Sequence, residues 1–481
     1  MSERTVDRAV KRIVVVGGGV GGLASALALS RAGHPVTVLE RDLLAPPADV
    51  EDAFTAERRG APQVHQTHGF LARLVVELRR HFPDVLDDLL AMGCTTMGLT
   101  ASLGEPMEGD DDLAVLVVRR TTFEWILRRA VLAQPGAEIR IGVAVAGLSG
   151  LAEDPRTDLP AVTGVVLDGG EVLDADAVIA ATGRRGPVPD WLGRLGVDVP
   201  ETVHESGLMY LSRWYRLPAE FGLPPDPKLA GDLGYLKFLG IPGDGNTFSV
   251  TLAIRVTDAE LRGLLTDPAS FDEAARQLEG PSLLWRHGAV EALTGVLPMG
   301  GLLNRIRRFT AGGQPSVLGF HAVGDAHTCT NPLYGRGCSL ALVQALAVAD
   351  AFAAHPGDPV ARALAYEAAS ARQIEPWFDM SVQTDAMGAD PAGKNISMPG
   401  TDPDTARRIA AVFAAAATDP VLGRGILRMF NMLATPSELM ADPEYLARAV
   451  AVMADPDRYP TPPVPGPTRD ELLVSLRTLA A

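Results

Sequence analysis

The stretch RIVVVGGGVGGLASALALSRAGHPVTVLER, residues 12–41, decides the fold of this chain. A β-branched run leads straight into glycines, an apolar helical pattern follows as far as Gly33, and a second β-branched run comes after it. In the spacing Gly17-x-Gly19-x-x-Gly22, the first glycine allows a tight turn and the second lets a pyrophosphate approach the backbone. The third lets the helix pack on the sheet. This order predicts a βαβ unit that binds a dinucleotide.

Four further positions complete the predicted dinucleotide site. Val20 and Gly21 begin the helix, whose free N–H groups and positive dipole end would face the diphosphate. Glu40 ends the second strand, where it can accept hydrogen bonds from the ribose hydroxyls, and Arg41 follows it. An acid at this place would repel a 2′-phosphate, which disfavours NADP in this site. The unit alone does not separate FAD from NAD.

The composition is that of a globular protein with two or three substructures. The 481 residues are 47% hydrophobic and 21% charged, and 49 glycines with 37 prolines indicate many turns. A net charge of −16 argues against nucleic acid or an anionic membrane surface as a partner. The three cysteines fit a reducing compartment. The polar first ten residues and the lack of a long uncharged apolar run predict a cytoplasmic protein without stable membrane insertion.

The hydrophobic pattern also predicts the elements outside the βαβ unit. Polar residues 42–67 indicate a long ordered loop or a mobile lid. Three strand-like runs over 138–181 suggest a β-meander ending in a sheet strand, and the alternation over 199–297 suggests an antiparallel sheet with a helix near 270–279. The other predicted elements are helices over 71–92, 121–133 and 339–354, strands over 113–118 and 317–323, and further helices over 360–481.

A second segment decides between the two dinucleotides. Gly324 and Asp325 follow a buried strand, where an acid can hold ribityl hydroxyls. In the sequence NPLYGRG, residues 331–337, the rigid Pro332 with Gly335 and Gly337 would let backbone N–H groups reach the N1/O2 edge of a flavin. The helix after this turn directs its positive end at the same edge. Two cofactor segments of this kind predict FAD.

Several motifs together resemble the flavoprotein monooxygenases of the para-hydroxybenzoate hydroxylase type, most closely the bacterial branch with polyether-pathway epoxidases and squalene-epoxidase-like enzymes. RRTTFEW, residues 119–125, is similar to a segment whose arginine, here Arg120, approaches the FAD pyrophosphate. Pro62 and Gln63 followed by His68 resemble a cofactor-side loop, and SRWYR, residues 212–216, resembles the strand that enters the substrate sheet. The resemblance covers most of residues 10–385 and implies that the chain binds FAD.

The resemblance also implies the fold class and the domain plan. The expected fold is α/β (α+β): a Rossmann-like FAD-binding domain with an inserted antiparallel β-sheet substrate domain and a C-terminal helical region. We expect the FAD-binding domain at 1–185 plus 298–355, the substrate domain at 186–297 and the helical region at 356–481. The implied activity is oxygenation of an apolar small molecule such as a polyketide, terpenoid or aromatic, by epoxidation or hydroxylation, in secondary metabolism. In this family O₂ reacts as a flavin C4a-hydroperoxide.

One position departs from the family pattern. Hydroxylases of the family usually carry Asp-Gly after the strand that precedes the substrate domain, and here Thr182-Gly183 stands there, as in the epoxidase-like branch. Both residues are expected near the cofactor. Because the family aspartate is implicated in NAD(P)H handling, the change puts direct reduction in doubt. NADH or NADPH would bind only transiently, or a separate flavin reductase would supply electrons.

An apolar, aromatic-lined space between the sheet and the flavin is what oxygenation requires. Since alternation turns every second strand residue away, about half of the candidates are expected to face the core instead. Arg213 and Arg336 are expected either to hold a substrate carboxylate or phosphate or to be ion-paired. No residue is assigned as catalytic. The candidate lining residues are Met209, Tyr210, Trp214, Tyr235, Phe238, Phe248 and Trp285.

The remaining reactive side chains are two histidines and two cysteines near the predicted cofactor segments. His65 and His68 have a metal-like spacing but no third ligand nearby, so no metal site is predicted. Cys329 and Cys338 flank the flavin turn, and the two alternatives for them are a covalent link to the flavin and packing as small apolar residues. Rival functions are an FAD-bound non-redox cyclase that closes rings pericyclically, a flavin-dependent reductase, and a halogenase, which the lack of a WxWxIP segment disfavours. The protein is expected to be a monomer or homodimer.

Overall fold

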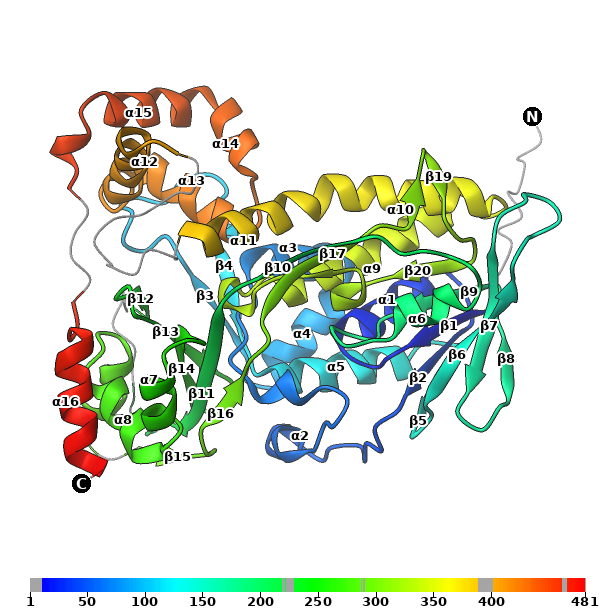
Figure 1. The fold of residues 1–481 in the computed structure, drawn as a ribbon, viewed down its shortest axis with the longest axis horizontal. Helices are drawn as coiled ribbons and strands as arrows, with labels where there is room; N and C mark the ends of the chain where they lie inside the picture. The colour runs from blue at the N-terminus through cyan, green and yellow to red at the C-terminus, as the bar shows by residue number, and fades with distance from the viewer. Residues whose placement is uncertain are drawn as a thin grey trace.

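A computed structural model describes residues 11–218, 221, 229–286, 288, 290–387, 401–460 and 465–480. The predicted outer domain limits at residues 1 and 481 lie outside these ranges. The architecture is a parallel sheet with helices on one face, a separate antiparallel sheet beside it, and helices at the C-terminal end (Figure 1). The predicted α/β class with a Rossmann-type FAD-binding sheet is therefore confirmed.

The dinucleotide-binding sheet is five-stranded and wholly parallel. Its order is β20-β9-β1-β2-β5, so the strand before the glycine loop lies at its centre. This central strand is buried along its whole length, as its continuous β-branched run predicts. The bounds are β1 (Ile13–Val16), β2 (Val36–Glu40), β5 (Ala137–Ile141), β9 (Ala177–Ala180) and β20 (Phe320–Ala322).

Helices cover one face of the parallel sheet and a small β-meander covers the other. The α1 helix packs against α9 and α5, and the core they share extends to α3 and α4. The helices are α1 (Val20–Arg31), α3 (Ala72–His81), α4 (Pro83–Ala91), α5 (Arg120–Leu132) and α9 (Gly337–Ala354). Pro83 divides the single helix predicted over 71–92 into two, because proline cannot continue a helix.

The meander differs in part from its prediction. It consists of β6 (Val145–Leu151), β7 (Ala161–Leu167) and β8 (Val172–Asp174), and with α6 (Val188–Gly193) it encloses a second core. The first predicted strand of the group is instead β5 at the edge of the parallel sheet. The local sequence does not show that this strand joins the parallel sheet, because its partner β2 lies about a hundred residues earlier.

The antiparallel sheet is six-stranded, with β11 and β14 at its centre. One face carries the large side chains that pack against α7, α8 and α16. The strands are β11 (Leu208–Arg216), β12 (Ala230–Asp232), β13 (Leu236–Gly243), β14 (Thr247–Arg255), β15 (Glu291–Ala292) and β16 (Leu297–Met299), and two of the helices are α7 (Ala259–Leu265) and α8 (Pro268–Arg276). Because β16 pairs with β11, the sheet extends slightly past the predicted domain limit at 297.

Shorter elements join these units. A three-stranded sheet pairs β17 with both β10 and β21, and two hairpins are formed by β3 with β4 and by β18 with β19. The bounds are β3 (Thr95–Gly98), β4 (Ala114–Val117), β10 (Glu201–Glu205), β17 (Leu303–Arg307), β18 (Thr310–Ala311), β19 (Gln314–Pro315), β21 (Thr328–Cys329) and α2 (Val50–Thr55), with single-turn helices η1 (Pro62–His65), η2 (Asp110–Asp112), η3 (Pro281–Trp285), η4 (Gly324–Ala326), η5 (Pro332–Tyr334) and η6 (Pro456–Arg458).

The C-terminal helical region separates into three parts. The first part, α10 and α11, packs along α9 and β17, whereas α12 to α15 enclose a small core of their own. The last helix, α16, leaves this group and packs on the antiparallel sheet beside α8 (Figure 1). The bounds are α10 (Pro359–Gln373), α11 (Glu375–Met387), α12 (Pro403–Ala415), α13 (Pro420–Phe430), α14 (Pro436–Ala441), α15 (Pro443–Ala454) and α16 (Arg469–Ala480).

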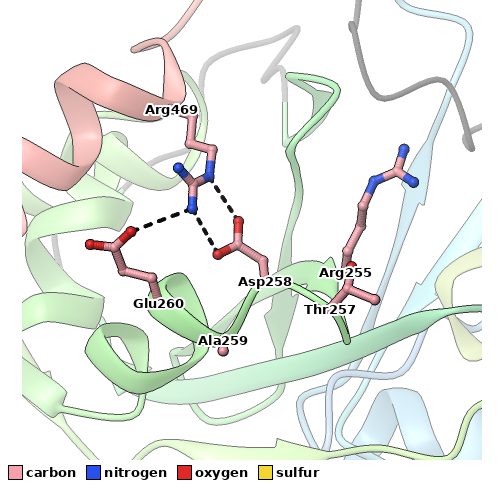
Figure 2. A pocket seen from close by; sticks show the side chains of 6 residues that line it. All are labelled: Arg255, Thr257, Asp258, Ala259, Glu260 and Arg469. Atoms are coloured by element: carbon pink, nitrogen blue, oxygen red, sulfur yellow. Dashed lines mark hydrogen bonds and ion pairs between the residues drawn. The ribbon is translucent and has the colours of Figure 1, made fainter.

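Ion pairs hold α16 in place. Figure 2 shows Arg469 reaching from α16 to Asp258 and Glu260 at the start of α7. The two bonds to the Asp258 carboxylate measure 2.9 Å each, and the Arg469–Glu260 pair measures 3.6 Å. The polar hollow that these residues line is thus the docking seam of the last helix, on the side of the sheet away from the dinucleotide-binding unit.

One helix within the described residues, α9, is long and apolar enough by composition to cross a membrane, and 67% of it is buried in the fold. The junction of α12 and α13 is bent by 105°, and the two pass the same test only when they are taken together. The α9 helix packs against α1, α3 and α10, which is the setting of a core helix.

Candidate active site

The carboxyl ends of neighbouring parallel strands bring the predicted cofactor residues together. Gly17 follows β1, Glu40 ends β2, Thr182 comes just after β9, and Gly324 comes just after β20. Because these strands are adjacent and parallel, all four positions lie along one edge of the sheet. In open α/β sheets this edge is where ligands bind, at the point where the strand order reverses.

The three glycines of the loop are required for different reasons. A β-carbon built at Gly22 would lie 1.8 Å from the Gly17 carbonyl oxygen, and one at Gly17 would lie 2.4 Å from the Ala181 carbonyl oxygen. Gly19 is different, because its nearest neighbours would be Glu124 Oε1 at 3.7 Å and a guanidinium nitrogen of Arg120 at 3.8 Å. The protein itself therefore leaves room for a side chain at Gly19, which is the space a bound pyrophosphate would need.

Two helix N-termini meet beside this space without side-chain caps. Gly19 caps α1 and Arg336 caps α9, and neither provides a side-chain hydrogen bond to the helix. A β-carbon at Gly21 would lie 3.5 Å from the Ala341 β-carbon and 3.8 Å from the Gly324 α-carbon. The glycine loop and the second cofactor segment are thus in contact. Uncapped N–H groups and two positive dipole ends make this corner a site for anionic groups.

Buried charges surround the loop. Glu40 accepts a 3.0 Å hydrogen bond from the Gly18 N–H, and its other carboxylate oxygen accepts from the Asp42 N–H at 2.9 Å. The Arg58 guanidinium bonds to Glu124 at 2.6 Å, to Glu40 at 3.2 Å and to Asp42 at 3.3 Å. The predicted ribose acid therefore lies in a cluster of carboxylates that share one arginine.

Arg58 and Glu124 are site residues that sequence reasoning missed. Arg58 lies in the acidic segment 42–67, and its side chain is 9% exposed whereas that of Arg59 is 90% exposed. Glu124 is 3% exposed on a helix face that otherwise carries Phe123, Ile126 and Leu127. A charged residue on an apolar helix face could have been recognised in the sequence as a site residue, because a buried carboxylate needs a charged or hydrogen-bonding partner.

Arg120 links the cluster to His68. The Arg120 guanidinium donates to Glu124 at 2.8 Å and to His68 Nε2 at 3.0 Å, and His68 Nδ1 lies 2.9 Å from the Gln66 carbonyl oxygen. Burial, with the Arg120 charge, lowers the pKa of His68 to about 3, so the ring is neutral. Its Nε2 must then accept from Arg120 while Nδ1–H donates to Gln66, and neither nitrogen is left for a metal.

Arg41 directly follows β2, and Gln63 lies farther along the chain. The exposed Arg41 reaches the Gly60 carbonyl oxygen at 3.2 Å, and the half-buried Gln63 lies on the η1 turn. The structure places both in the segment that follows β2. Whether they contact the cofactor stays a prediction.

The second cofactor segment contributes an acid and a hydroxyl. Asp325 lies on η4, and burial raises the pKa of its carboxyl against the opposing charges of Arg120, Arg184 and Arg305. The Thr182 hydroxyl oxygen is buried and has no hydrogen-bond partner among the described residues, and Gly183 follows it with a φ of +73°. A buried polar atom without a partner is costly, and a cofactor hydroxyl would satisfy the Thr182 oxygen, while the Asp325 carboxylate could accept from another. These residues fit FAD.

The turn NPLYGRG lies against both the loop around His68 and the antiparallel sheet. A β-carbon at Gly335, where φ is +65°, would lie 3.3 Å from the Gly69 α-carbon. The Asn331 side chain accepts from the Leu333 N–H at 3.1 Å, which caps the turn that begins at Pro332, and the Tyr210 hydroxyl from β11 donates to the same oxygen. The sheet therefore contacts the predicted flavin turn directly. Gly337 begins α9 at the end of this turn.

Strand alternation divides the predicted pocket residues, as expected. Tyr210 and Trp214 face the dinucleotide-binding unit, and the Trp214 indole N–H donates to the His65 carbonyl oxygen at 2.8 Å. Phe248 lies in the core shared with α7, α8 and α16, with Met209 and Phe238, and Trp285 packs against it. Phe248 is paired with Tyr215 on β11, and paired residues share a face of the sheet. Tyr215 lies five residues after Tyr210, and since side chains alternate along a strand, Tyr215 and Phe248 lie on the face opposite Tyr210.

Three more predicted side chains have other roles in the structure. Tyr235 donates to the Pro467 carbonyl oxygen at 2.9 Å, beside α16. Arg213 pairs with Asp272 of α8 at 2.7 Å. The fully buried Arg336 guanidinium bonds to the Trp377 carbonyl oxygen and to Met380 of α11. Tyr235, Arg213 and Phe248 therefore do not line the space facing the flavin turn, and the ion-paired alternative holds for Arg213.

An apolar cluster that sequence reasoning did not single out lies where the sheet meets the turn. Tyr210, Ala253 and Leu302 are buried together, and the half-buried Leu208, Met299 and Leu333 pack against them. Leu333 belongs to the flavin turn and the others come from β11, β14, β16 and the chain after β16. These side chains form an apolar surface next to the turn.

Comparisons with known proteins agree with this geometry. Residues 12–105 match the family model described as FAD dependent oxidoreductase. The chain is 30% identical over 177 residues to the chloroplastic zeaxanthin epoxidase of Spinacia oleracea, a match that covers 36% of this chain and 24% of that protein. The chain thus spans about a quarter of the length of the curated relatives that it matches first.

Solved structures share the fold across most of the chain. PqsL of Pseudomonas aeruginosa, a probable FAD-dependent monooxygenase, has a TM-score of 0.59 at 18% identity and covers 80% of this chain and 98% of its own. The flavin-dependent brominase Bmp2 has a TM-score of 0.62 at 17% identity, covering 93% and 98%. The Diels-Alderase PyrE3 has a TM-score of 0.57 at 16% identity, covering 88% and 80%. Residues 12–105 therefore match the FAD dependent oxidoreductase model, and the chain shares its fold with these flavin-dependent proteins.

Proposed function

We propose that this protein is an FAD-dependent monooxygenase that transfers one oxygen atom from O₂ to an apolar small molecule, by epoxidation or hydroxylation. The observation that best supports this proposal is the hydrogen bond between Tyr210 of the antiparallel sheet and Asn331 of the flavin turn. It joins an apolar surface to the place where the reactive end of the cofactor is proposed to lie. The partial match to an epoxidase and the fold shared with monooxygenases support the proposal.

The chain's own residues would divide the binding of FAD between the two cofactor segments. Gly19, Val20, Gly21 and Arg120 would hold the pyrophosphate, and Glu40 the ribose. Asp325 and Thr182 would hold the ribityl chain. Bound FAD supplies the redox chemistry and the activation of O₂, which no protein side chain provides.

The apolar cluster would position the substrate and exclude water. Tyr210 and Leu302 form its buried part, and the half-buried Leu208, Met299 and Leu333 would contact the substrate. Burial raises the pKa of Tyr210 well above its usual range, so its hydroxyl stays protonated and keeps its bond to Asn331. A dry apolar wall protects a reactive oxygen species from water and selects hydrophobic substrates.

The source of electrons and the setting of the reaction belong to the same proposal. Thr182-Gly183 in place of Asp-Gly favours transient NADH or NADPH binding or a separate flavin reductase over a permanent nicotinamide site. The burial of α9 within the fold supports a protein without membrane insertion, and a cytoplasmic location belongs to the proposal. A role in secondary metabolism and a monomeric or homodimeric state complete the proposal.

A ring-closing cyclase that keeps FAD as a structural element is the alternative with a specific observation behind it. The Thr182 position and the fold shared with a Diels-Alderase are both compatible with it. The two functions differ in their need for electrons. A cyclase would convert its substrate with oxidised flavin and without O₂, whereas a monooxygenase would do neither.

Flavin reduction and product mass together test the proposal. Bound FAD should be bleached by NADH, NADPH or a flavin reductase without air, and admission of O₂ should add one oxygen atom to an apolar compound. Met299→Trp should raise KM by filling the apolar cluster while FAD content stays normal, and Met440→Trp, at an exposed methionine of α14, serves as the matched control. Flavin that no donor can reduce would contradict oxygenation, and halide incorporation would indicate a halogenase instead.

A further inference from the structure

Asp385, near the end of α11, reaches the predicted flavin turn from outside both cofactor segments. Its Oδ1 accepts from the Asn331 side-chain amide at 2.7 Å and from the Tyr334 hydroxyl at 2.6 Å, and its Oδ2 accepts from the Asn304 amide at 2.7 Å. Asn331 and Tyr334 belong to the turn, and Asn304 lies on β17. One carboxylate thus ties three elements together.

Asn331 is the centre of this arrangement because every polar group of its side chain is used. Its amide nitrogen donates to Asp385, and its side-chain oxygen accepts from Tyr210 and from the Leu333 N–H. Its backbone N–H donates to the Asn304 side chain at 2.8 Å. Fixing Asn331 therefore fixes the start of the turn and, through Tyr210, the position of the sheet beside it.

The carboxylate is held by neutral donors. The salt bridges found among the described residues include none to Asp385, and the nearby Arg336 is bonded instead to Trp377 and Met380, with its guanidinium 4.9 Å above the Tyr334 ring. Burial, followed by the Asp385 charge, raises the pKa of Tyr334, so its hydroxyl remains a donor. Asp385 is half-buried, and its charge interacts with that of Arg336 although no salt bridge joins the two. A negative charge that is partly removed from water acts over a longer range than one in water.

We propose that Asp385 is a positioning residue that fixes the flavin turn, and that its charge makes the bound flavin harder to reduce. Reduced flavin carries negative charge, so a carboxylate close to the turn disfavours reduction. The inference rests on the proposed function only for the placement of FAD against residues 331–337. It concerns the cofactor in the resting protein and does not depend on which substrate is used.

Asp385→Asn tests the charge with little change in shape. An asparagine keeps an acceptor for Asn331 and Tyr334 and loses the bond to Asn304. We expect a tenfold shift of the oxidised-to-reduced ratio toward reduced flavin, which is about 30 mV upward for a two-electron couple. Tyr334→Phe removes a donor that offsets the charge, so the potential should move downward. Asp379→Asn, at an exposed position on the same helix, is the matched control and should leave the potential unchanged.

The positioning role is tested separately through FAD dissociation. Asp385→Ala should release FAD about tenfold faster than the wild type, about 1.4 kcal/mol, and Asp385→Asn should restore most of the affinity. Unchanged potentials in both Asp385→Asn and Tyr334→Phe, with FAD retained, would overturn the inference. If the Asp385 variants do not fold, the Tyr334→Phe potential alone decides it. A wild-type protein that takes up no FAD would instead contradict the proposed function, which keeps the two failures distinguishable.

Discussion

Replacing Gly19 by valine should separate cofactor binding from folding. A β-carbon at this position meets no protein atom closer than 3.7 Å, and the backbone has φ −85° and ψ −174°, a region that valine adopts readily. The variant should therefore fold. The added methyl groups would occupy the space between Gly19 and Arg120 where the pyrophosphate is expected.

The expected magnitudes follow from this geometry. Loss of glycine at the helix N-cap should cost the apoprotein about 0.5–1 kcal/mol. Each lost hydrogen bond to a charged phosphate contributes about 1.5–3 kcal/mol, so losing one or two should weaken FAD binding by about 3 kcal/mol, or roughly a hundredfold. The effect on the cofactor should thus exceed the effect on the fold several times over.

The assay compares FAD titration by fluorescence quenching with urea unfolding of the apoprotein. Gly22→Ala is the matched control, because its β-carbon would lie 1.8 Å from the Gly17 carbonyl oxygen and should destabilise the apoprotein itself. Yellow Gly19→Val protein with wild-type FAD affinity would refute the placement of the pyrophosphate. If Gly19→Val lowers the free energy of unfolding of the apoprotein as much as Gly22→Ala does, the view that glycine is needed at position 19 for a ligand is refuted.

Three further changes test other parts of the account. Asp325→Ala should lower FAD affinity at least tenfold in titration without lowering apoprotein stability, because burial already disfavours this carboxylate; a destabilised apoprotein with normal affinity would contradict this. Asp244→Asn should cost about 3 kcal/mol in urea unfolding, because it breaks the buried pair with Arg119, whereas Asp232→Asn in an exposed pair should cost under about 1 kcal/mol. Burial would raise the pKa of Glu124, but Arg120 and Arg58 outweigh it and lower that pKa from 4.5 to about 2. The ionised carboxylate therefore stabilises the fold above pH 4.5, and this contribution is lost as the pH falls toward 2. Glu124→Gln should flatten that part of the stability profile, and an unchanged slope would argue against the pairing of Glu124 with these arginines.

The sequence was sufficient for the parts of the site that rest on local geometry. The order strand, glycine loop, helix and acid is set within thirty residues, and β1, α1 and β2 form where the hydrophobic period changes. The positions of Gly324 and Asp325 after a buried strand could be inferred for the same reason. Parallel pairing then brings these segments to one edge, as the fold class requires.

The sequence could not show which face of a strand meets the cofactor. Tyr210 and Phe248 are both aromatic and both buried, and only the register between β11 and β14 places them on opposite faces. Asp385 was also out of reach, because its partner Asn331 is more than fifty residues away and nothing in the local pattern marks it. Arg58 and Glu124 were easier to predict, because a buried carboxylate on an apolar helix face needs a positively charged partner.

The most direct test of the central claim is a single-turnover experiment with isotopically labelled O₂. The bound flavin is reduced without air, mixed with labelled O₂ and a panel of apolar compounds, and the products are analysed by mass spectrometry. A monooxygenase should place one labelled oxygen atom in a product and reoxidise one flavin for each product molecule. Conversion of a compound with oxidised flavin and no label in the product would contradict oxygenation.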